Sequence, residues 1–475
     1  MKKSACFCLG IALLLAACAI NPVTGKRELS LISEQQEIEL GKETDAEIGQ
    51  EYGYYSDPEL NRYVDSVGQS MIPYTHRPKL IYHFAVLDTP VVNAFAAPGG
   101  YVYVTRGILA LMGSESELAA VLGHEIGHVN ARHTVRQMST QILVQAGLAV
   151  GSALNETFAK VAGVAGLGAQ LLFLKFSRDD ERQADGLGLQ YARAVHYNTG
   201  EMITFFSALE RYGDLSGGSS LPGFLSTHPL TSERIQNVKS MLTEDDVAPP
   251  VKREPYLARI DGLVFGDDPR QGFVENGTFY HPGMRFRFSV PAGWKVQNAP
   301  ARVTMASDKG DAAVIFQTEK TDESLPAYAQ KKAGAIEGRK PVSEQPGTIS
   351  GMAALHQTYD IVKEGQDTLR ARFSFIRRGD QIFTFTSLSK AVDFNRFDAT
   401  FQSAVSSFSG LRDPSYLNRR PQTIQVLKAD GRLSLKDYFA KNNAKKETWS
   451  YLTIMNGMKD ADAVPEPSRL LKLVR

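Results

Sequence analysis

The residues that could do chemistry together begin with His-Glu-Ile-Gly-His at positions 124–128. On a helix, His124 and His128 are four residues apart and project from the same face, which is the spacing that places two imidazoles on one zinc ion. Glu125 lies beside them and could accept a proton from water at the metal. The segment therefore predicts two ligands for one Zn²⁺ per chain, together with a general base.

The helix that must carry these residues is predicted by other features of the sequence. Ser114 and Glu117 have the spacing of a capping box, so a helix should begin at about residue 115. Leu118, Val121 and Ile126 then approximate one apolar stripe. We therefore expect a helix over this segment on grounds that are independent of any function.

A third ligand must come from elsewhere in the chain. On a continuous helix His133 would face away from His124, so we expect His133 to be a surface or structural histidine. Glu181 and Asp185 are again four residues apart on a predicted helix. One of these two carboxylates could bind zinc while the other holds a ligand histidine by its distal N–H.

Several stretches together resemble one family of enzymes. They are the histidine motif, the Ser-Arg-x-x-Glu-x-x-Ala-Asp pattern at 177–185, the segment 93–100 and the segment 21–26. This combination resembles the HtpX and CAAX-prenyl-protease family of zinc metallopeptidases, in its periplasmic lipoprotein branch, over about residues 18–245. The resemblance implies a zincin-like (gluzincin) fold and a zinc endopeptidase activity.

The resemblance also implies roles for individual residues. It implies zinc on His124, His128 and Glu181. It further implies Glu125 as the general base and Asp185 as the residue that holds a ligand histidine.

Two residues further along the chain could assist the reaction. His228 and Arg234 lie between the motif helices and an acidic break, and either could donate a hydrogen bond to an oxyanion. His228 could instead cap a helix. If it reached the zinc, it would occupy the position of the water and keep the enzyme latent.

Strand-forming residues precede the histidine motif. The segments 81–87 and 100–105 are rich in β-branched and aromatic residues and predict a small sheet. The strand at 100–105 could offer an open edge to an extended peptide, or it could lie inside the sheet.

The N-terminus predicts export. A charged start and an apolar run identify residues 1–17 as a signal peptide. The sequence Leu-Ala-Ala-Cys ending at Cys18 resembles a lipobox, which implies acylation of Cys18 and a lipid anchor in the membrane. Ala19 and Ile20 resemble the sorting pattern of the outer membrane of a Gram-negative-type bacterium, with the protein facing the periplasm. The alternatives are an inner-membrane lipoprotein and a soluble periplasmic protein after simple signal cleavage.

The rest of the chain suggests an α+β protein with several parts. A mainly helical peptidase domain with a small sheet occupies residues 18–245, followed by an acidic, proline-containing linker at 246–257. An α+β accessory domain follows at 258–412. Residues 422–475 resemble a βααβ LysM module, which would contact peptidoglycan or an envelope complex, although a structural cap is an equal alternative. The Ala/Gly-rich stretch 142–174 could be a lid or a buried helix pair.

Composition narrows the function. The chain has 475 residues and a net charge of +1, so no basic excess indicates a nucleic-acid partner. All three cysteines fall within the first 18 residues, so a downstream metal site must use His and carboxylates. We expect a zinc endopeptidase that acts on unfolded or misassembled envelope proteins. The alternative is a periplasmic scaffold or chaperone with a latent zinc site.

Overall fold

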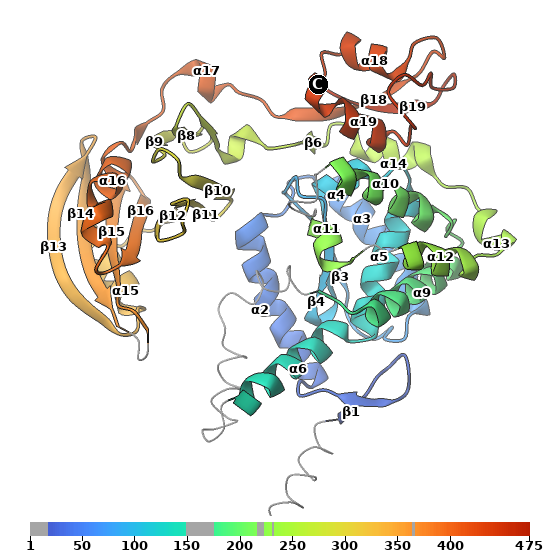
Figure 1. The fold of residues 1–475 in the computed structure, drawn as a ribbon, viewed down its shortest axis with the longest axis horizontal. Coiled ribbons are helices and arrows are strands. Elements are labelled where there is room, and N and C mark those ends of the chain that lie inside the picture. The colour runs from blue at the N-terminus through green and yellow to red at the C-terminus, as the bar shows by residue number, and fades with distance from the viewer. Residues whose placement is uncertain (1–17, 149–174, 216–222, 230–231, 363–365) are drawn as a thin grey trace, which may run out of the picture. The chain divides into compact units, whose positions relative to one another are not determined.

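The computed structural model describes residues 18–148, 175–215, 223–229, 232–362 and 366–475 (Figure 1). The predicted signal peptide and most of the stretch 142–174 lie outside the described residues. The described chain forms two compact units. One holds Gly53–Gly266, Gln422–Arg475 and the residues before Gln50, and the other holds Gln50–Tyr52 and Asp267–Pro421. Within the described ranges, no helix has both the length and the apolar character needed to span a bilayer.

The first unit mixes helices with short strands. Up to the histidine motif its elements are β1 (Cys18–Ile20), β2 (Arg27–Leu29), α2 (Glu34–Tyr52), α3 (Pro58–Met71), β3 (His83–Leu87), β4 (Ala94–Ala97), β5 (Tyr101–Thr105), α4 (Arg106–Leu111) and α5 (Glu115–Asn130). The later elements are α6 (His133–Leu148), α9 (Arg178–Ala194), α10 (Glu201–Leu215), α11 (Gly223–Thr227), α12 (Ser232–Met241), α13 (Glu244–Val247), α14 (Arg253–Ile260) and β6 (Val264–Phe265). This mixture agrees with the predicted α+β class.

A three-stranded sheet lies against the central helix α5. Its strand order is β3-β5-β4, with β3 parallel to β5 and β4 antiparallel to it. The strand expected at 100–105 therefore lies in the interior of the sheet, because β5 has a neighbour on both sides. The prediction of an open edge there is wrong. Strands β3 and β4 are the two edges of this sheet, and β4 packs against α5.

Helix α5 begins where its sequence predicts and ends at a change in backbone conformation. Its N-cap Ser114 accepts a hydrogen bond from the amide of Glu117, and every residue of the helix is buried. After Asn130 the chain cannot continue as a helix, because Arg132 has a left-handed backbone with φ of 55°. The chain changes direction at Arg132, and α6 starts at His133.

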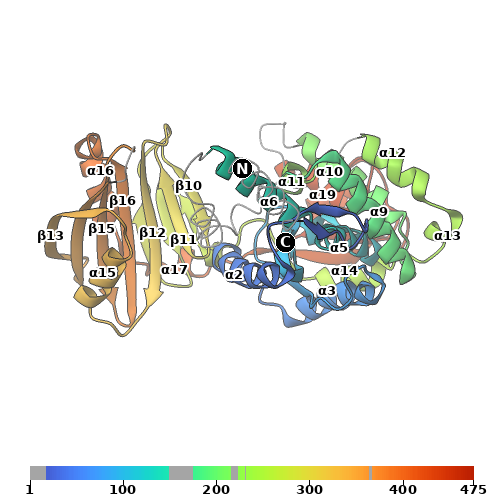
Figure 2. The same ribbon diagram turned by 90° about the horizontal axis from the view of Figure 1, so that it is seen from below.

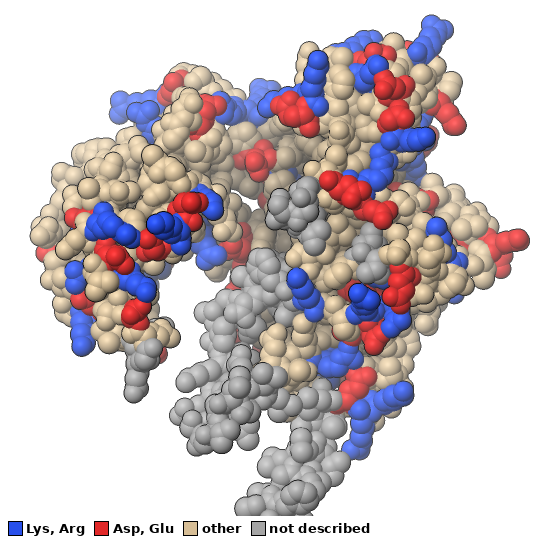
Figure 3. Space-filling view, in the orientation of Figure 1, with Lys and Arg blue, Asp and Glu red and all other residues tan. Residues whose placement is uncertain are grey.

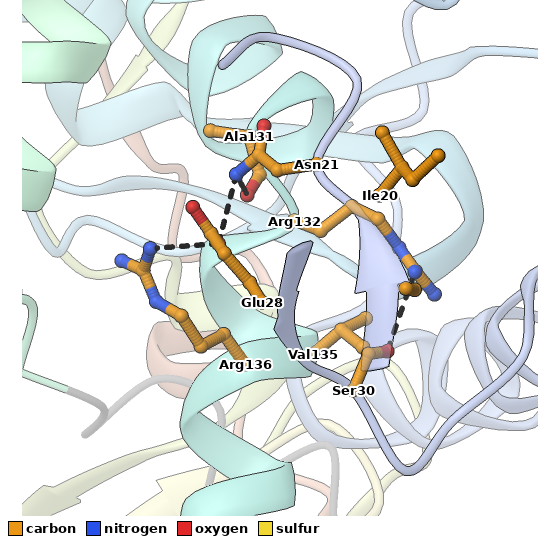
Figure 4. Close-up of a pocket in the computed structure, with 9 residues that line it drawn as sticks. Ile20, Asn21, Glu28, Ser30, Ala131, Arg132, Val135 and Arg136 are labelled. Atoms are coloured by element: carbon orange, nitrogen blue, oxygen red, sulfur yellow. Dashed lines mark hydrogen bonds and ion pairs between the residues drawn. The ribbon is translucent and has the colours of Figure 1, made fainter. Parts of the chain in front are cut away.

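The hairpin of β1 and β2 packs on this change of direction (Figure 4). The side-chain amide of Asn21 donates to the carbonyl of Ala131, and Arg132 donates to the Ser30 hydroxyl. Glu28 pairs with Arg136 in the first turns of α6. The segment that resembled the lipoprotein branch thus fixes the position at which α6 begins.

Helices α5 and α9 approach each other closely because glycines line their contact. A Cβ atom added to Gly188 would lie 2.8 Å from the amide nitrogen of His124, and one added to Gly127 would lie 3.0 Å from the carbonyl oxygen of Ala184. Neither position has room for a side chain. The glycines therefore bring the motif histidines of α5 within reach of the carboxylates of α9.

The C-terminal segment belongs to this same unit. It contains β18 (Gln422–Lys428), α18 (Leu435–Lys441), α19 (Trp449–Met455) and β19 (Leu470–Val474). β18 pairs with β19 and with β6, and its apolar residues join the hydrophobic core of the peptidase part. The grouping differs from the predicted division in two ways. Residues 422–475 belong to the first unit, and the predicted linker contains the end of α13 and the start of α14. The likeness to a LysM module stays a prediction.

The second unit is built on antiparallel sheets (Figure 2). Its seven-stranded sheet has the order β10-β11-β12-β16-β15-β14-β13, and a four-stranded sheet has the order β17-β9-β8-β7. The small sheet comprises β7 (Phe273–Glu275), β8 (Thr278–His281), β9 (Phe286–Ser289) and β17 (Ser409–Gly410). The large one comprises β10 (Lys295–Ala299), β11 (Arg302–Ala306), β12 (Ala312–Lys320), β13 (Arg339–Ile349), β14 (Met352–Ile361), β15 (Leu369–Arg378) and β16 (Gln381–Lys390).

Two helices cover opposite faces of the large sheet. Helix α15 (Leu325–Gly334) packs with Leu355, Phe375 and Ile382, and α16 (Phe394–Ser406) packs with their sequence neighbours Ala354, Ile376 and Phe383. This alternation is what a sheet that is buried on both faces requires. A short helix α17 (Pro414–Leu417) follows.

Charged side chains are interspersed on the face of the molecule seen in Figure 3. Lysine and arginine neighbour aspartate and glutamate on both units there. This pattern agrees with the near-zero net charge of the sequence.

Candidate metal centre

The structure brings four predicted residues to one buried point. His124 and His128 come from α5, Glu181 comes from α9, and His228 follows α11. One ligand atom of each lies within 4.8 Å of one atom of every other member, and all four side chains are buried. Nε2 of His124 lies 3.0 Å from Nε2 of His128 and 3.3 Å from Nδ1 of His228.

These separations can be tested against the size of a zinc ion. Two donor atoms that each lie about 2.0–2.2 Å from one ion at a tetrahedral angle are about 3.3–3.6 Å apart. The carboxylate of Glu181 lies 3.6 Å from Nε2 of both His124 and His128, and 2.9 Å from Nδ1 of His228. Burial lowers the pKa of His128 well below its usual value, so this imidazole is neutral as a metal ligand must be. The donor set therefore fits zinc.

Asp185 and Arg234 contact the cluster residues on the side that faces away from the cluster centre. Oδ1 of Asp185 lies 2.9 Å from Nδ1 of His124, the nitrogen that faces away from the cluster. Arg234 on α12 donates to both oxygens of Asp185 at 2.7 and 2.8 Å and contacts Glu181 at 2.6 Å. Burial alone would raise the pKa of Asp185, but hydrogen bonds from His124 and Arg234 outweigh it and lower the pKa to about 2. Asp185 is thus placed to orient His124.

Glu125 lies beside the cluster in a position that suits a base. Its side chain is fully buried, and its Oε1 is 3.7 Å from Nε2 of His228. Burial raises the pKa of Glu125 to about 7, although the charge of His124 opposes the shift. A carboxylate with this pKa can both accept and return a proton near neutral pH.

His133 is buried beside the cluster. The sequence left a surface and a structural role open, and the structure supports the structural one, because only 1% of His133 is exposed. Its Nδ1 lies 2.8 Å from Nδ1 of His128, and its Nε2 lies 2.9 Å from the side-chain oxygen of Gln183. The argument from a continuous helix failed because the backbone turns at Arg132. His133 therefore orients His128 as Asp185 orients His124, and the left-handed Arg132 had no signal in the sequence.

His228 is directed into the cluster, and not toward a helix end. Its ring stacks on Phe224 at 4.7 Å between centroids, and its Nδ1 meets Glu181. The capping alternative does not describe this side chain, whereas the ligand and oxyanion alternatives both remain compatible with its position.

Comparisons with known proteins find similarity over part of the chain. Residues 58–242 match the model of peptidase family M48. The chain is 28% identical to the beta-barrel assembly-enhancing protease of Yersinia pestis over 324 residues, which is 66% of this chain and 62% of that protein. It is 31% identical to the protein of the same name from Escherichia coli (strain K12) over 229 residues, 46% of each chain.

A mitochondrial relative is similar over about half of the chain. The metalloendopeptidase OMA1 of Schizosaccharomyces pombe is 28% identical over 230 residues, 48% of this chain and 67% of that protein. Among solved structures, cyanobacterial PsbP from Synechocystis sp. PCC 6803 aligns with 28% of this chain and 91% of its own, at 12% identity and a TM-score of 0.24.

The comparisons and the site point to the same part of the chain. Residues 58–242 are similar to peptidase family M48, and the four buried side chains that could hold a metal ion all lie within this range. The domain is related to the beta-barrel assembly-enhancing proteases. The chain spans less than two thirds of the length of those bacterial relatives.

Proposed function

We propose that this chain hydrolyses internal peptide bonds of unfolded or misassembled envelope proteins, with zinc held by His124, His128 and Glu181. The observation that carries the proposal is the convergence of these three buried donors beside the Glu125 carboxylate. A zinc ion in such a site polarises a carbonyl and lowers the pKa of water toward neutrality. The name given to the bacterial relatives, which refers to β-barrel assembly, supports a substrate in the envelope.

The residues of the chain divide the remaining work. Glu125 would accept a proton from the attacking water and return it to the leaving amine. Asp185 and His133 fix the two ligand imidazoles, and Arg234 compensates the two buried carboxylates of α9. Oxyanion stabilisation would come from His228 if its ring moved out of the ligand cluster.

The substrate would lie along β4. This strand is an edge of the three-stranded sheet and packs against α5, next to Glu125. Pairing with an edge strand uses main-chain hydrogen bonds, so it selects extended segments and no particular side chains. That selectivity suits a protease for unfolded proteins.

The location and partners follow from the sequence. Cleavage of residues 1–17 and acylation of Cys18 would anchor the chain to the periplasmic face of the outer membrane, with the inner membrane or a soluble state as alternatives. The LysM-like order of residues 422–475 supports contact with peptidoglycan or with an envelope complex. The membrane location and the envelope contact are thus parts of the proposed function.

A second candidate is a latent or scaffold state. His228 lies 2.9 Å from Glu181 and 3.3 Å from His124, so its Nδ1 is positioned as a fourth donor. Four protein ligands close a zinc site, and three leave a position for water. A chain held in this arrangement would bind envelope proteins without cleaving them.

Casein cleavage by purified residues 19–475, with zinc content measured in parallel, separates these candidates. We expect cleavage by the wild type and its loss in both a chelated sample and Glu125→Gln that retains zinc. A wild type that carries zinc and cleaves nothing would instead favour the latent state, and His228→Ala should then gain activity. An unchanged basal rate in a zinc-loaded His228→Ala would contradict latency through this residue.

A further inference from the structure

The second unit contains a cavity that the peptidase chemistry does not use. It has a volume of about 370 Å³ and lies between the large sheet and α16. This volume is within the range of small-molecule sites, about 300–1,000 Å³. The apolar part of its wall comes from Ile349, Phe401 and Val405.

The sheet side of the cavity carries polar residues in two rows across the strands. The strand pairing gives one row of Ser343, Thr358, Arg372 and Ser387, and a second of Gln345, His356 and Ser374. On β15, Arg372 and Ser374 share a face with Ile376, which belongs to the hydrophobic core under α16. The apolar core therefore gives way to polar rows on one face where the cavity lies. Ligand sites combine an apolar wall with a few convergent polar groups, as this lining does.

Ser387 supplies a second observation. It lines the cavity, none of its surface is exposed, and its hydroxyl has no hydrogen-bond partner among the described residues. A buried hydroxyl without a partner is destabilising by about 1–3 kcal/mol, so such groups are rare unless something else satisfies them. A ligand in the cavity would satisfy this one.

The lining selects the chemistry of the ligand. None of the described residues that line the cavity carries a carboxylate, whereas Arg372, His356 and several hydroxyls can donate hydrogen bonds. Arg372 pairs with Asp398, outside the lining, through Nη1 only, and a guanidinium has further donors in its fork. Nδ1 of His356 lies 2.8 Å from the Ser374 hydroxyl.

We propose that this cavity binds a small organic anion whose carboxylate or phosphate group accepts hydrogen bonds from Arg372 and Ser387. The apolar part of the ligand rests on Phe401 and Val405. The site is independent of the zinc centre, because all of its lining residues belong to the second unit.

Histidine NMR on the full-length chain tests the proposal. The Cε1–H signal of His356, assigned by its loss in His356→Gln, is followed during titration with inorganic phosphate and, separately, with benzoate. We expect a saturable shift with at least one probe. A shift with phosphate alone identifies a phosphate ligand, and a shift with benzoate alone identifies a carboxylate with an apolar part. No saturable shift with either probe up to about 50 mM overturns the proposal.

Matched variants locate the binding. Arg372→Gln should weaken binding about 10- to 100-fold, the loss expected for hydrogen bonds to a charged group. Arg370→Gln is the control, because Arg370 lies two residues away on β15 and pairs with Asp360 outside the lining. Equal effects of the two substitutions would place the binding elsewhere and overturn the assignment.

A second variant keeps the test decisive if Arg372→Gln does not fold. Ser387→Ala removes a hydroxyl that has no partner, so it should leave stability unchanged or raise it while weakening binding about 3- to 10-fold. Ser389→Ala, on the same strand and outside the lining, loses a hydrogen bond to the Lys390 carbonyl and should leave binding unchanged. Unaltered affinity in Ser387→Ala would contradict the proposal.

Discussion

Two arginine–aspartate pairs flank helix α9, and they differ in exposure. Arg234 and Asp185 are both buried, with 3% of each side chain exposed. Arg193 leaves 48% of its side chain exposed while it contacts the buried Asp246 at 2.5 and 2.9 Å. The chemistry of the two pairs is the same, and only the environment of the guanidinium differs.

The difference indicates separate purposes. Burying both charges of a pair carries a desolvation penalty that can exceed the attraction, so a buried pair is weak evidence of net stabilisation. Arg234 instead keeps the carboxylates of Asp185 and Glu181 charged and directed at the cluster. The half-exposed Arg193 keeps much of its hydration, so its desolvation penalty on pairing is small. It attaches the segment around α13 to the end of α9. One pair positions the site and the other joins parts of the fold.

The largest effect that separates the pairs is expected from Arg234→Gln. It removes the guanidinium from two buried carboxylates, which then keep only their histidine partners, and this should lower the free energy of unfolding by about 3–5 kcal/mol. Zinc affinity should fall about 10- to 100-fold, because Asp185 no longer orients His124. Urea unfolding of the zinc-free protein and zinc titration against a competing chelator measure the two effects.

Arg193→Gln is the control for that comparison. It should lower the free energy of unfolding by about 1 kcal/mol and leave zinc affinity unchanged, since its partner Asp246 is not a member of the cluster. Equal losses of zinc affinity in both variants would show that the two pairs do not differ in purpose.

An intermediate effect is expected where α9 meets α5. Gly188→Ala places a Cβ 2.8 Å from the amide nitrogen of His124, so α9 must move away and take Glu181 with it. We expect a loss of about 1–3 kcal/mol in stability and a reduced zinc content. Gly186→Ala is the matched control on the same helix, because its Cβ would meet only Met241 Sδ at 3.9 Å. Helix propensity predicts that this control is neutral or slightly stabilising. Full zinc content in Gly188→Ala would mean that the helix contact does not position the site.

The parts of the site that the sequence could predict are local. His124, His128 and Glu125 follow from spacing on one helix, and the same spacing of Glu181 and Asp185 on another predicted a carboxylate ligand. Which of the two carboxylates binds the metal was implied only by the family resemblance. The position of His228 depends on the tertiary path of α11, which no local pattern records. His133 was misplaced because one residue with left-handed backbone ends α5, and an arginine gives no sign of that conformation.

In the fold, as in the site, local sequence patterns predicted the elements, whereas contacts between distant segments were not predictable. The α+β class and the strand segments before α5 followed from composition and alternation. The order β3-β5-β4 did not, because strand pairing joins segments that the sequence pattern treats separately. The acidic run around Asp246 resembled an exposed linker, yet Asp246 is buried because Arg193, 53 residues earlier in the chain, supplies its partner.

That buried carboxylate gives the smallest and most specific prediction. Burial alone would raise the pKa of Asp246, but hydrogen bonds from Arg193 and from the amide and hydroxyl of Thr243 outweigh it and lower the pKa to about 2. A pKa below the ordinary value of 3.8 means that the folded state favours the charged form. The stabilisation is therefore complete above about pH 5 and is lost as the pH falls through 3.8 toward 2.

Asp246→Asn should accordingly destabilise the protein by about 1 kcal/mol at pH 7, and the difference from the wild type should shrink below pH 4. Urea unfolding of both proteins at pH 7, 5 and 3 measures it. Asp245→Asn removes the same charge from the neighbouring residue and should show no such pH dependence, because that side chain is exposed. A difference for Asp246→Asn that stayed constant from pH 7 to pH 3 would mean that packing of the side chain, and not its charged pair with Arg193, holds α13 against α9.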